Sequence, residues 1–242
     1  RRFDLPNAGT LEQDRLERMG ASGESPLLVL ASPATWQDET VARTAIDRAR
    51  EILSADHPEV LKAEARWISE FRPDEEVRRR PVVAALVAEM ERGSEDPQLP
   101  LALARLVATG ESPDEALLER ALRRRLLLAP DDLRPYADLA RLLLSNGQEG
   151  AAAELADTLL ERSVANSDGR RQAAAILQAT GRREAAIDIV RELVATESLE
   201  QDRLTLAAIL REGDDDADRA EAGRILLAAA DRPDASLEAV VQ

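Results

Sequence analysis

Small and apolar residues recur at a constant step of 34 residues in the C-terminal half of the chain. The pair Leu139–Ala140 is followed at that step by Ala173–Ala174 and then by Ala207–Ala208, and Gly147 is followed by Gly181. A step kept at several positions indicates a structural unit that is repeated along the chain. Such a unit cannot bury its apolar face alone, so its neighbours must stack against it. The step therefore predicts a row of stacked units in place of one closed core.

The segment 133–163 shows what one unit contains. Two stretches with apolar residues at helical spacing flank Asn146–Gly147, and glycine supplies the backbone conformation that ends a helix. The small side chain of Ala140 lets the first helix approach the second closely, and Ala152 has the same role on the second helix. The unit is thus predicted to be a pair of antiparallel helices joined by a short turn.

This segment resembles the tetratricopeptide repeat, a helix–turn–helix of 34 residues. Numbered from Leu133 as position 1, the family positions 4, 7, 8, 11 and 20 are held by Tyr136, Leu139, Ala140, Leu143 and Ala152. The resemblance is clearest over residues 97–231 and implies an all-α fold, a right-handed α-solenoid of antiparallel helix pairs. Within a region 97–242 we expect tetratricopeptide-like repeats at 97–130, 131–164, 165–198 and 199–232.

The later repeats depart from the pattern of the first. Position 4 becomes Arg170 and then Leu204, so the aromatic residue is lost. The last unit has a longer loop at 213–217, and Ala222 therefore competes with Ala220 as the small contact of its second helix. The helix pair itself is still predicted in both units.

One more unit is predicted upstream of residue 131. Ser112 is expected as the N-cap of its second helix and Pro113 as the first helical residue, with the helix ending near Leu128. Its first helix matches positions 4, 7, 8 and 11 and the turn with Leu99, Ala102, Leu103, Leu106 and Gly110.

Residues 1–96 are expected to form irregular helix pairs that continue the solenoid. One amphipathic helix is predicted at 35–54, and Pro58 is expected to open a second. Prolines are expected to break the next stretch, so that a further helix covers 81–92. The short apolar run 27–31 is interpreted as a helix.

The composition excludes several kinds of site. Hydrophobic residues make up 44% of the chain and aromatic residues only 2%, which favours helices rich in Ala and Leu. The chain has no Cys, which excludes a disulfide, a thiolate nucleophile and a Cys-ligated metal. Its single histidine, His57, cannot form a two-His metal site, and we interpret it as a loop residue at a helix end. No cofactor, no metal and no catalytic residue are predicted.

The charge of the chain narrows the choice of partners. The net charge of −15 repels phosphate backbones, so no nucleic acid is expected as a partner. Cationic partners fit better, although acidity alone also keeps Ala-rich helices in solution. No apolar run approaches the ~20 residues of a membrane span, so this segment is not expected to insert into a membrane.

The basic residues and the first residue bear on origin. Lys62 is the one Lys among 32 basic residues, and with the high Ala content this indicates a bacterial protein of the cytoplasm or periplasm. The chain starts at Arg1 without Met and shows no signal peptide or transmembrane segment. We interpret it as a processed chain or as part of a larger multi-domain chain or assembly.

Three acidic residues have the spacing of a calcium loop. Asp214, Asp216 and Asp218 are spaced like the first ligands of such a loop, but Arg219 and Ile225 stand where Gly and Glu are needed. We therefore interpret the acids as residues that favour the start of the following helix.

Two runs of arginine are the other charged clusters. Residues 78–80 and 123–125 could bind a phosphate or an acidic peptide. We interpret both as solvated helix ends, the second placed where cations complement the helix dipole.

The resemblance also implies where a ligand binds. In the family, the first helix of each repeat lines a groove with positions 2, 5, 6, 9, 12 and 13. Arginine and amide side chains at such positions suit a peptide backbone or a carboxylate. The family's carboxylate clamp needs Lys and Asn at set positions that this chain lacks. The candidate ligand-binding residues are Arg134, Asp138, Arg141, Arg171, Gln172 and Gln178.

Two functional hypotheses follow. The first is a non-catalytic protein–protein interaction scaffold that binds a peptide or helix of a partner in the concave groove. The alternative is a periplasmic repeat domain of a larger bacterial secretion or exopolysaccharide-export protein that recruits an enzyme or guides a cationic polymer. An enzyme built on helical repeats is a third possibility, which no residue pattern in the sequence supports.

Overall fold

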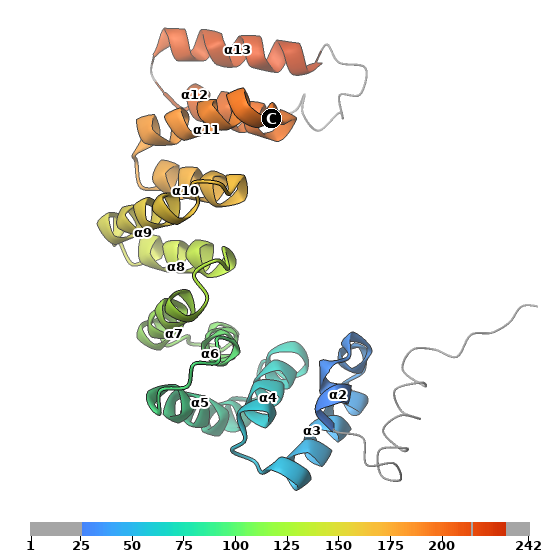
Figure 1. Cartoon of the computed structure of the whole chain (residues 1–242). Coiled ribbons are helices and arrows are strands. Elements are labelled where there is room, and N and C mark those ends of the chain that lie inside the picture. Colours follow the sequence, from blue (N-terminus) through green and yellow to red (C-terminus); the bar gives the residue numbers. More distant parts are fainter. Residues whose placement is uncertain (1–25, 214, 231–242) are drawn as a thin grey trace, which may run out of the picture. The chain divides into compact units, whose positions relative to one another are not determined.

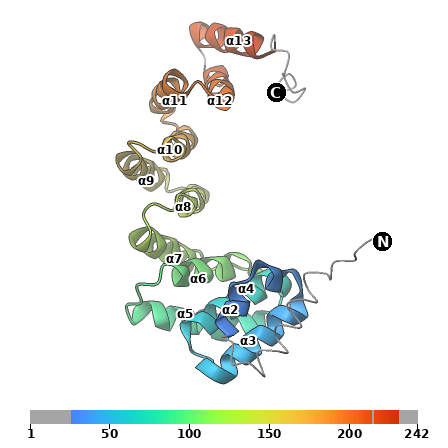
Figure 2. The same ribbon diagram turned by 45° about the vertical axis from the view of Figure 1, so that its right-hand side comes forward.

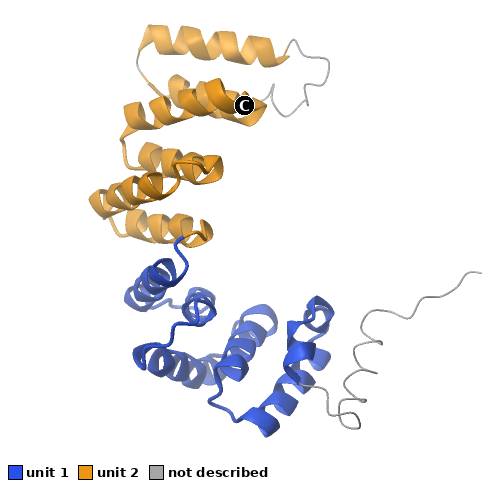
Figure 3. Ribbon diagram, in the orientation of Figure 1, with its two compact units in different colours: residues 1–130 blue, residues 131–242 orange. Residues whose placement is uncertain are grey.

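The structure is a computed structural model that describes residues 26–213 and 215–230. Throughout these residues the secondary structure is helical and contains no strand, which confirms the predicted all-α fold (Figure 1). The chain divides into two compact units, residues 1–130 and 131–242 (Figure 3). Each unit is a stack of antiparallel helix pairs, the α-solenoid arrangement that the repeats predict.

In the described part of the first unit, the first helix contains the apolar run 27–31, which is helical as expected. The helices there are α2 (Pro26–Ala31), the 3₁₀ helix η1 (Pro33–Gln37), α3 (Glu39–Leu53), α4 (Pro58–Phe71), α5 (Glu76–Glu91), α6 (Gln98–Ala108) and α7 (Glu115–Leu128).

Over residues 131–213 and 215–230, the second unit contains three helix pairs with short connections inside each pair. They are α8 (Arg134–Ser145) with α9 (Glu149–Arg162), α10 (Ser167–Ala179) with α11 (Arg183–Glu197), and α12 (Glu200–Arg211) with α13 (Asp216–Ala230).

The packing of these helices repeats one scheme. In the first unit α4 packs on α5 and on α6, α5 also packs on α6, and α6 packs on α7. In the second unit α10 contacts α8, α9 and α11, and the two views of the ribbon agree on this order (Figures 1 and 2). Helices α4, α6, α8, α10 and α12 are thus the first helices of their pairs, and α5, α7, α9, α11 and α13 are the second helices.

The first helices share one pattern of buried residues. Each has two adjacent buried residues, then one residue that is not buried, then two more buried residues, so that one face of the helix packs against its partners. In α8 these are Leu139–Ala140 and Leu142–Leu143. The second residue of the first buried pair is Ala in every first helix, namely Ala65, Ala104, Ala140, Ala174 and Ala207. This is the small residue of repeat position 8, where two helices approach each other closely.

The spacing of these alanines explains why the repeats are hard to align by sequence. From one first helix to the next they are separated by 39, 36, 34 and 33 residues. Only one of these spacings is the 34-residue step, because the loops between helices differ in length. The helix α4 has the burial pattern of a first helix, but the 34-residue step does not reach it, so it lies outside the predicted repeats.

The structure corrects the predicted alignment in three units. Ala208 is exposed, and the pair equivalent to Ala173–Ala174 is Leu206–Ala207. In α6 the buried pair is likewise Leu103–Ala104, one residue after the predicted Ala102–Leu103. In α13 the longer loop selects Ala222, which is fully buried, over the exposed Ala220, so the second of the two open alternatives is correct.

Three predicted helix starts were wrong. The predicted helix 35–54 is two elements, because Asp38 caps α3 by accepting hydrogen bonds from Thr40 N and Val41 N and so ends η1 before it. Pro81 does not open α5, which starts at Glu76 and contains this proline in its interior. The N-cap of α7 is Asp114, which accepts from Leu117 N, and not Ser112.

The turn glycines serve two different purposes. Gly147 and Gly181 have positive φ angles of 68° and 77°, as predicted for a residue that ends a helix. Gly110, which was predicted to do the same, has no positive φ; a Cβ atom there would lie 2.8 Å from Arg79 Nη1. The buried guanidinium of Arg79 donates a hydrogen bond to Thr109 O at 3.2 Å, so this glycine makes room for an arginine that caps α6.

Candidate functional site

The buried alanine of each first helix fixes which residues lie at the predicted groove positions. In α4, with Ala65 at position 8, positions 5 and 9 are Lys62 and Arg66. In α6, with Ala104 at position 8, positions 2, 5, 6 and 9 are Gln98, Leu101, Ala102 and Arg105.

A cavity of about 190 Å³ lies between these two helices. Its lining consists of Lys62, Arg66, Gln98, Leu101, Ala102 and Arg105. Every one of these residues stands at a groove position of its repeat. The first unit therefore contains a groove on its first-helix face, built by α4 and α6 together.

A second cavity continues this groove toward α2. It has a volume of about 240 Å³ and shares Lys62, Arg66 and Gln98 with the first. Its other walls are mostly apolar and come from α2, η1 and α4, with Leu27, Leu30, Ala31, Trp36, Glu59 and Ala63. The groove thus has a basic part over α6 and an apolar part over α2. We call the two cavities together the α4–α6 groove.

Lys62 is held in place at the centre of the groove. Its Nζ lies 2.7 Å from Glu59 Oε1 and 2.5 Å from Asp96 Oδ2, and the side chain is 16% exposed. Burial alone would raise the pKa of Asp96, but the hydrogen bonds from Lys62 and from the amide of Gln98 keep that pKa below its ordinary value. Asp96 also accepts from Gln98 N at 2.8 Å, which helps to start α6. Lys62 therefore joins the start of α6 to α4.

Arg66 lies flat on an aromatic ring at the apolar end. Its guanidinium carbon is 4.0 Å from the centre of the Trp36 ring, and its Nε donates to Glu70 Oε1 at 2.8 Å. The ring itself is fixed, since Trp36 Nε1 donates to Leu30 O at 2.9 Å. The stack of Arg66 on Trp36 is a cation–π contact that keeps the cation at the edge of the apolar wall.

The candidate residues on α8 remain exposed to solvent. Arg134 and Arg141 have side chains that are each 77% exposed, and Asp138 is 54% exposed. Arg141 forms an ion pair with Asp138 on its own helix, with Nη1 3.2 Å from Oδ1, and Arg134 forms one with Asp132. Such exposed ion pairs contribute little to stability, so these side chains are accessible to a partner.

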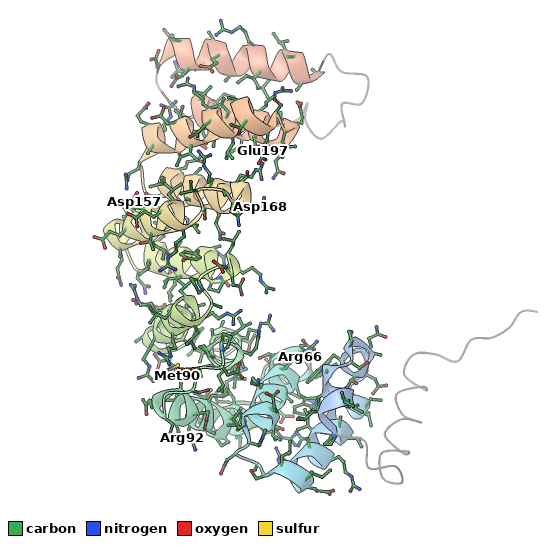
Figure 4. The ribbon with its side chains drawn as sticks, viewed as in Figure 1. Arg66, Met90, Arg92, Asp157, Asp168 and Glu197 are labelled. Atoms are coloured by element: carbon green, nitrogen blue, oxygen red, sulfur yellow. The ribbon has the colours of Figure 1, made fainter. Side chains whose placement is uncertain are left out.

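Arg171 on α10 belongs instead to a network of ion pairs. Its guanidinium contacts Asp168 on the same helix, Glu197 at the end of α11 and Asp202 on α12. Figure 4 shows Asp168 and Glu197 on the same side of the second unit, at neighbouring helix ends. The hydrogen bond with Asp202 above all raises the pKa of Arg171.

Of the two glutamines of α10, Gln178 contacts the next repeat. Gln178 donates from Nε2 to Glu212 Oε2 at 2.8 Å, beside the C-terminal end of α12. Gln172 is half-buried on the same helix. Arg171 and Gln178 thus contact the neighbouring repeat, whereas Arg134, Asp138 and Arg141 are exposed on α8.

Sequence reasoning missed the α4–α6 groove because the position-8 alanines of α4 and α6, Ala65 and Ala104, are 39 residues apart. One signal was present in the chain: position 9 is arginine in three successive first helices, as Arg66, Arg105 and Arg141. The signal becomes visible only after the buried alanines have fixed the register.

The prediction of solvated helix ends holds for only part of the two arginine clusters, because Arg78, Arg80 and Arg123 are exposed but the others are not. Arg79 and Arg125 are only 4% and 5% exposed. Arg125 Nη1 donates to Pro97 O at 2.6 Å, and Arg124 Nη2 donates to Ser94 O at 3.1 Å. Backbone carbonyls of the loop before α6 therefore hold this cluster, as Thr109 O holds Arg79.

The other charged candidates have structural roles at helix starts. His57 is the N-cap of α4, where its Nδ1 accepts a hydrogen bond from Glu59 N at 3.2 Å. Asp216 is the first residue of α13, and Asp218 binds Arg183 Nη2 at 2.6 Å. Asp214 lies outside the described residues. The acids therefore serve the start of α13, as interpreted.

A larger hollow of about 600 Å³ lies between α3, α4 and α5. It contains Glu64, a buried carboxylate that accepts from Arg43 Nη1 at 2.8 Å and from Arg50 Nη2 at 2.9 Å. Glu64 on α4 is thus paired with two cations of α3. Among residues 26–213 and 215–230, no helix is long and apolar enough to cross a membrane.

Comparisons with known proteins agree with this architecture. No family model matches the sequence. The curated proteins also give no match. Among solved structures, a "MamA protein" shares 12% identity and a TM-score of 0.50 over 80% of this chain and 94% of its own. A "Podosopora anserina putative kinesin light chain nearly identical TPR-like repeats" shares 16% identity and a TM-score of 0.51, over 81% of this chain and 98% of its own.

At these identities the likeness shows the fold alone. Both neighbours extend over most of this chain and are covered nearly whole. The chain therefore has the fold of tetratricopeptide-repeat proteins.

Proposed function

We propose that the protein is a non-catalytic interaction scaffold that binds a peptide segment or helix of a partner protein along its first helices. The observation that carries this proposal is the α4–α6 groove, whose inner cavity is lined by groove positions of the repeat alone. In a stack of helix pairs each helix is held by its neighbours before a ligand binds. Binding to such a face therefore loses little conformational entropy.

The residues of the groove favour binding over catalysis. Burial alone would lower the pKa of Lys62, but its hydrogen bonds to Asp96 and Glu59 raise that pKa above its ordinary value. A general acid or base needs a pKa close to the working pH, which charge pairing opposes. Arginine and amide side chains beside apolar walls suit the side chains and the main chain of a peptide.

The overall charge supports a protein partner over a nucleic acid. The chain carries 47 acidic and 32 basic residues, and its surface repels a phosphate backbone. A peptide needs only a local match of charge, which a groove of a few side chains can provide.

Display of random 12-residue peptides on phage tests the proposal. The full chain is used for selection, and enriched peptides are then measured by fluorescence polarisation against Ala102→Trp, which fills the inner cavity. Ala220→Trp, on the exposed side of α13, is the matched control. We expect enriched peptides that lose affinity for the first variant and keep it for the second. Failure to enrich any peptide, or equal binding to both variants, would overturn the proposal.

A further inference from the structure

We infer that the α4–α6 groove selects an acidic peptide segment that carries a large apolar side chain next to its carboxylates. This inference rests on the proposed function and names the class of ligand for one groove. Three features of the groove point to it: its cationic lining, an arginine without an ion pair among the described residues, and the apolar wall beside them.

The lining of the groove is basic in an otherwise acidic protein. Its charged residues are the cations Lys62, Arg66 and Arg105 and the single carboxylate Glu59. Glu59 and Asp96 compensate Lys62, and Glu70 compensates Arg66, so the positive charge left for a ligand is that of Arg105, in a chain whose net charge is −15. A partner that reaches this groove with negative charge gains attraction that the rest of the surface does not offer.

Arg105 is the cation that a ligand can use most directly. It is exposed at position 9 of α6, and within the described part of the chain its guanidinium forms no ion pair or hydrogen bond. A guanidinium can bind both oxygens of a carboxylate in one plane, which makes it a specific receptor for Asp or Glu.

Arg66 can contribute to the same ligand after an exchange of partners. Its ion pair with Glu70 is exposed on both sides, at 40% and 39% of the side chains. Exposed pairs of this kind contribute on the order of 0–1 kcal/mol, so a ligand carboxylate can replace Glu70 at little cost. The stack on Trp36 holds the guanidinium in place while that exchange occurs.

The apolar side of the groove accounts for the second part of the ligand. Leu30 and Trp36 line the cavity next to Arg66, and the Trp36 ring is fixed by its hydrogen bond to Leu30 O. A leucine or aromatic side chain of the peptide can cover these surfaces while its neighbouring carboxylates meet the arginines. The exposed amide of Gln98 stands between the two parts, where it can both donate to and accept from a peptide main chain.

Two matched libraries of 12-residue peptides test this inference on the full chain. Both hold Leu or Phe at two central positions; one holds Glu at three flanking positions, and the other holds Lys there. Affinities are measured by fluorescence polarisation at two salt concentrations. The variants are Arg105→Glu, Arg105→Lys and the control Arg80→Glu, whose side chain is 79% exposed on the second helix α5.

We expect the Glu library to bind and the Lys library not to bind. Arg105→Glu should weaken the best Glu peptides about tenfold or more, Arg105→Lys should retain part of the affinity, and Arg80→Glu should change it less than about twofold. Added salt should weaken binding, because exposed charges are screened over about 8 Å at physiological ionic strength.

Three outcomes overturn the inference in different ways. Preference for the Lys library, or equal affinity of wild type and Arg105→Glu for the Glu peptides, removes the acidic ligand but leaves a binding scaffold. Binding of random phage peptides without binding of either library has the same meaning. If neither the phage peptides nor the libraries bind, the proposed function fails as well.

Discussion

Arg171 on α10 and Asp202 on α12 form a two-pronged ion pair between neighbouring repeats. Arg171 Nε lies 2.7 Å from Asp202 Oδ1, and Nη2 lies 2.9 Å from Oδ2. The carboxylate is almost inaccessible, with 2% of Asp202 exposed. Arg171 was a candidate for ligand binding from its sequence position, but this geometry makes it a structural link between two first helices.

Removal of either partner of this pair should destabilise the fold. We expect Asp202→Ala and Arg171→Ala each to lower the free energy of unfolding, with a coupling of about 1–3 kcal/mol in a double-mutant cycle. Urea denaturation followed by circular dichroism measures all four chains. Arg141→Ala, at an exposed groove position, is the control and should stay within about 0.5 kcal/mol. Additive single effects would show that the pair does not couple the helices.

The close approach of helices at repeat position 8 leads to a second prediction. Ala174 is 2% exposed on α10, and Ala140 is 3% exposed on α8. Replacing either with Leu should overpack the helix pair and cost about 1–3 kcal/mol in a urea titration. Ala175→Leu tests the adjacent exposed position and should be close to neutral. Equal stability of Ala174→Leu and Ala175→Leu would contradict the register derived from burial.

Gly110 and Gly150 should respond to Ala in opposite directions. A Cβ at Gly110 would displace Arg79, whose hydrogen bond to Thr109 O helps to cap α6. We expect Gly110→Ala to lower stability by about 1–3 kcal/mol, the range for hydrogen bonds of charged groups. Gly150 lies in α9 with nothing near its added Cβ, so Gly150→Ala should raise stability by about 0.4–1 kcal/mol. Thermal melts of the two variants provide the comparison, and a shift in the same direction would exclude the capping role.

The ion pair between Lys62 and Asp96 should make the free energy of unfolding depend on pH in the acidic range. The pKa of Asp96 is below its ordinary value of 3.8 in the folded chain, so its ionised form stabilises the fold above that pH. This contribution is lost as the pH falls from about 4 through the lower folded pKa. Asp96→Asn should therefore cost about 0.5–1 kcal/mol at pH 7 and progressively less below pH 4. A stability difference from wild type that is the same at pH 7 and pH 3 would show that the charge of Asp96 is not involved.

Much of the fold follows from the sequence because its signals are local. Apolar residues at helical spacing, Asn146–Gly147 at a turn and Pro58 at a helix start each act within a few residues of the chain, and the structure confirms the helices they predict. One wrong start arose because the chain offers two residues that are both good N-caps, Ser112 and Asp114. Residue type alone does not separate them, and the structure uses Asp114.

The groove was harder to predict because its register depends on loop length. Lys62 and Arg66 belong to a first helix whose distance from the next one is five residues longer than the common step. The partners of a long side chain are also set in space, not along the chain. Arg171 and Arg105 have the same residue type at groove positions, but only Arg171 faces a buried carboxylate from another helix. Pattern reading alone cannot separate these two cases.

The loops differ in length, but the same alanine is buried on every first helix. This architecture therefore tolerates insertions and deletions between its helix pairs. The surplus or deficit of a few residues between first helices lies in the connections and in the second helices, which have 14 to 16 residues, while the alanine stays buried on each first helix. A pair such as α10 with α11 could thus be duplicated or excised as a cassette, provided that its alanine stays in phase with those on either side. The position of this one alanine on each first helix therefore defines where such a chain can be cut and rejoined.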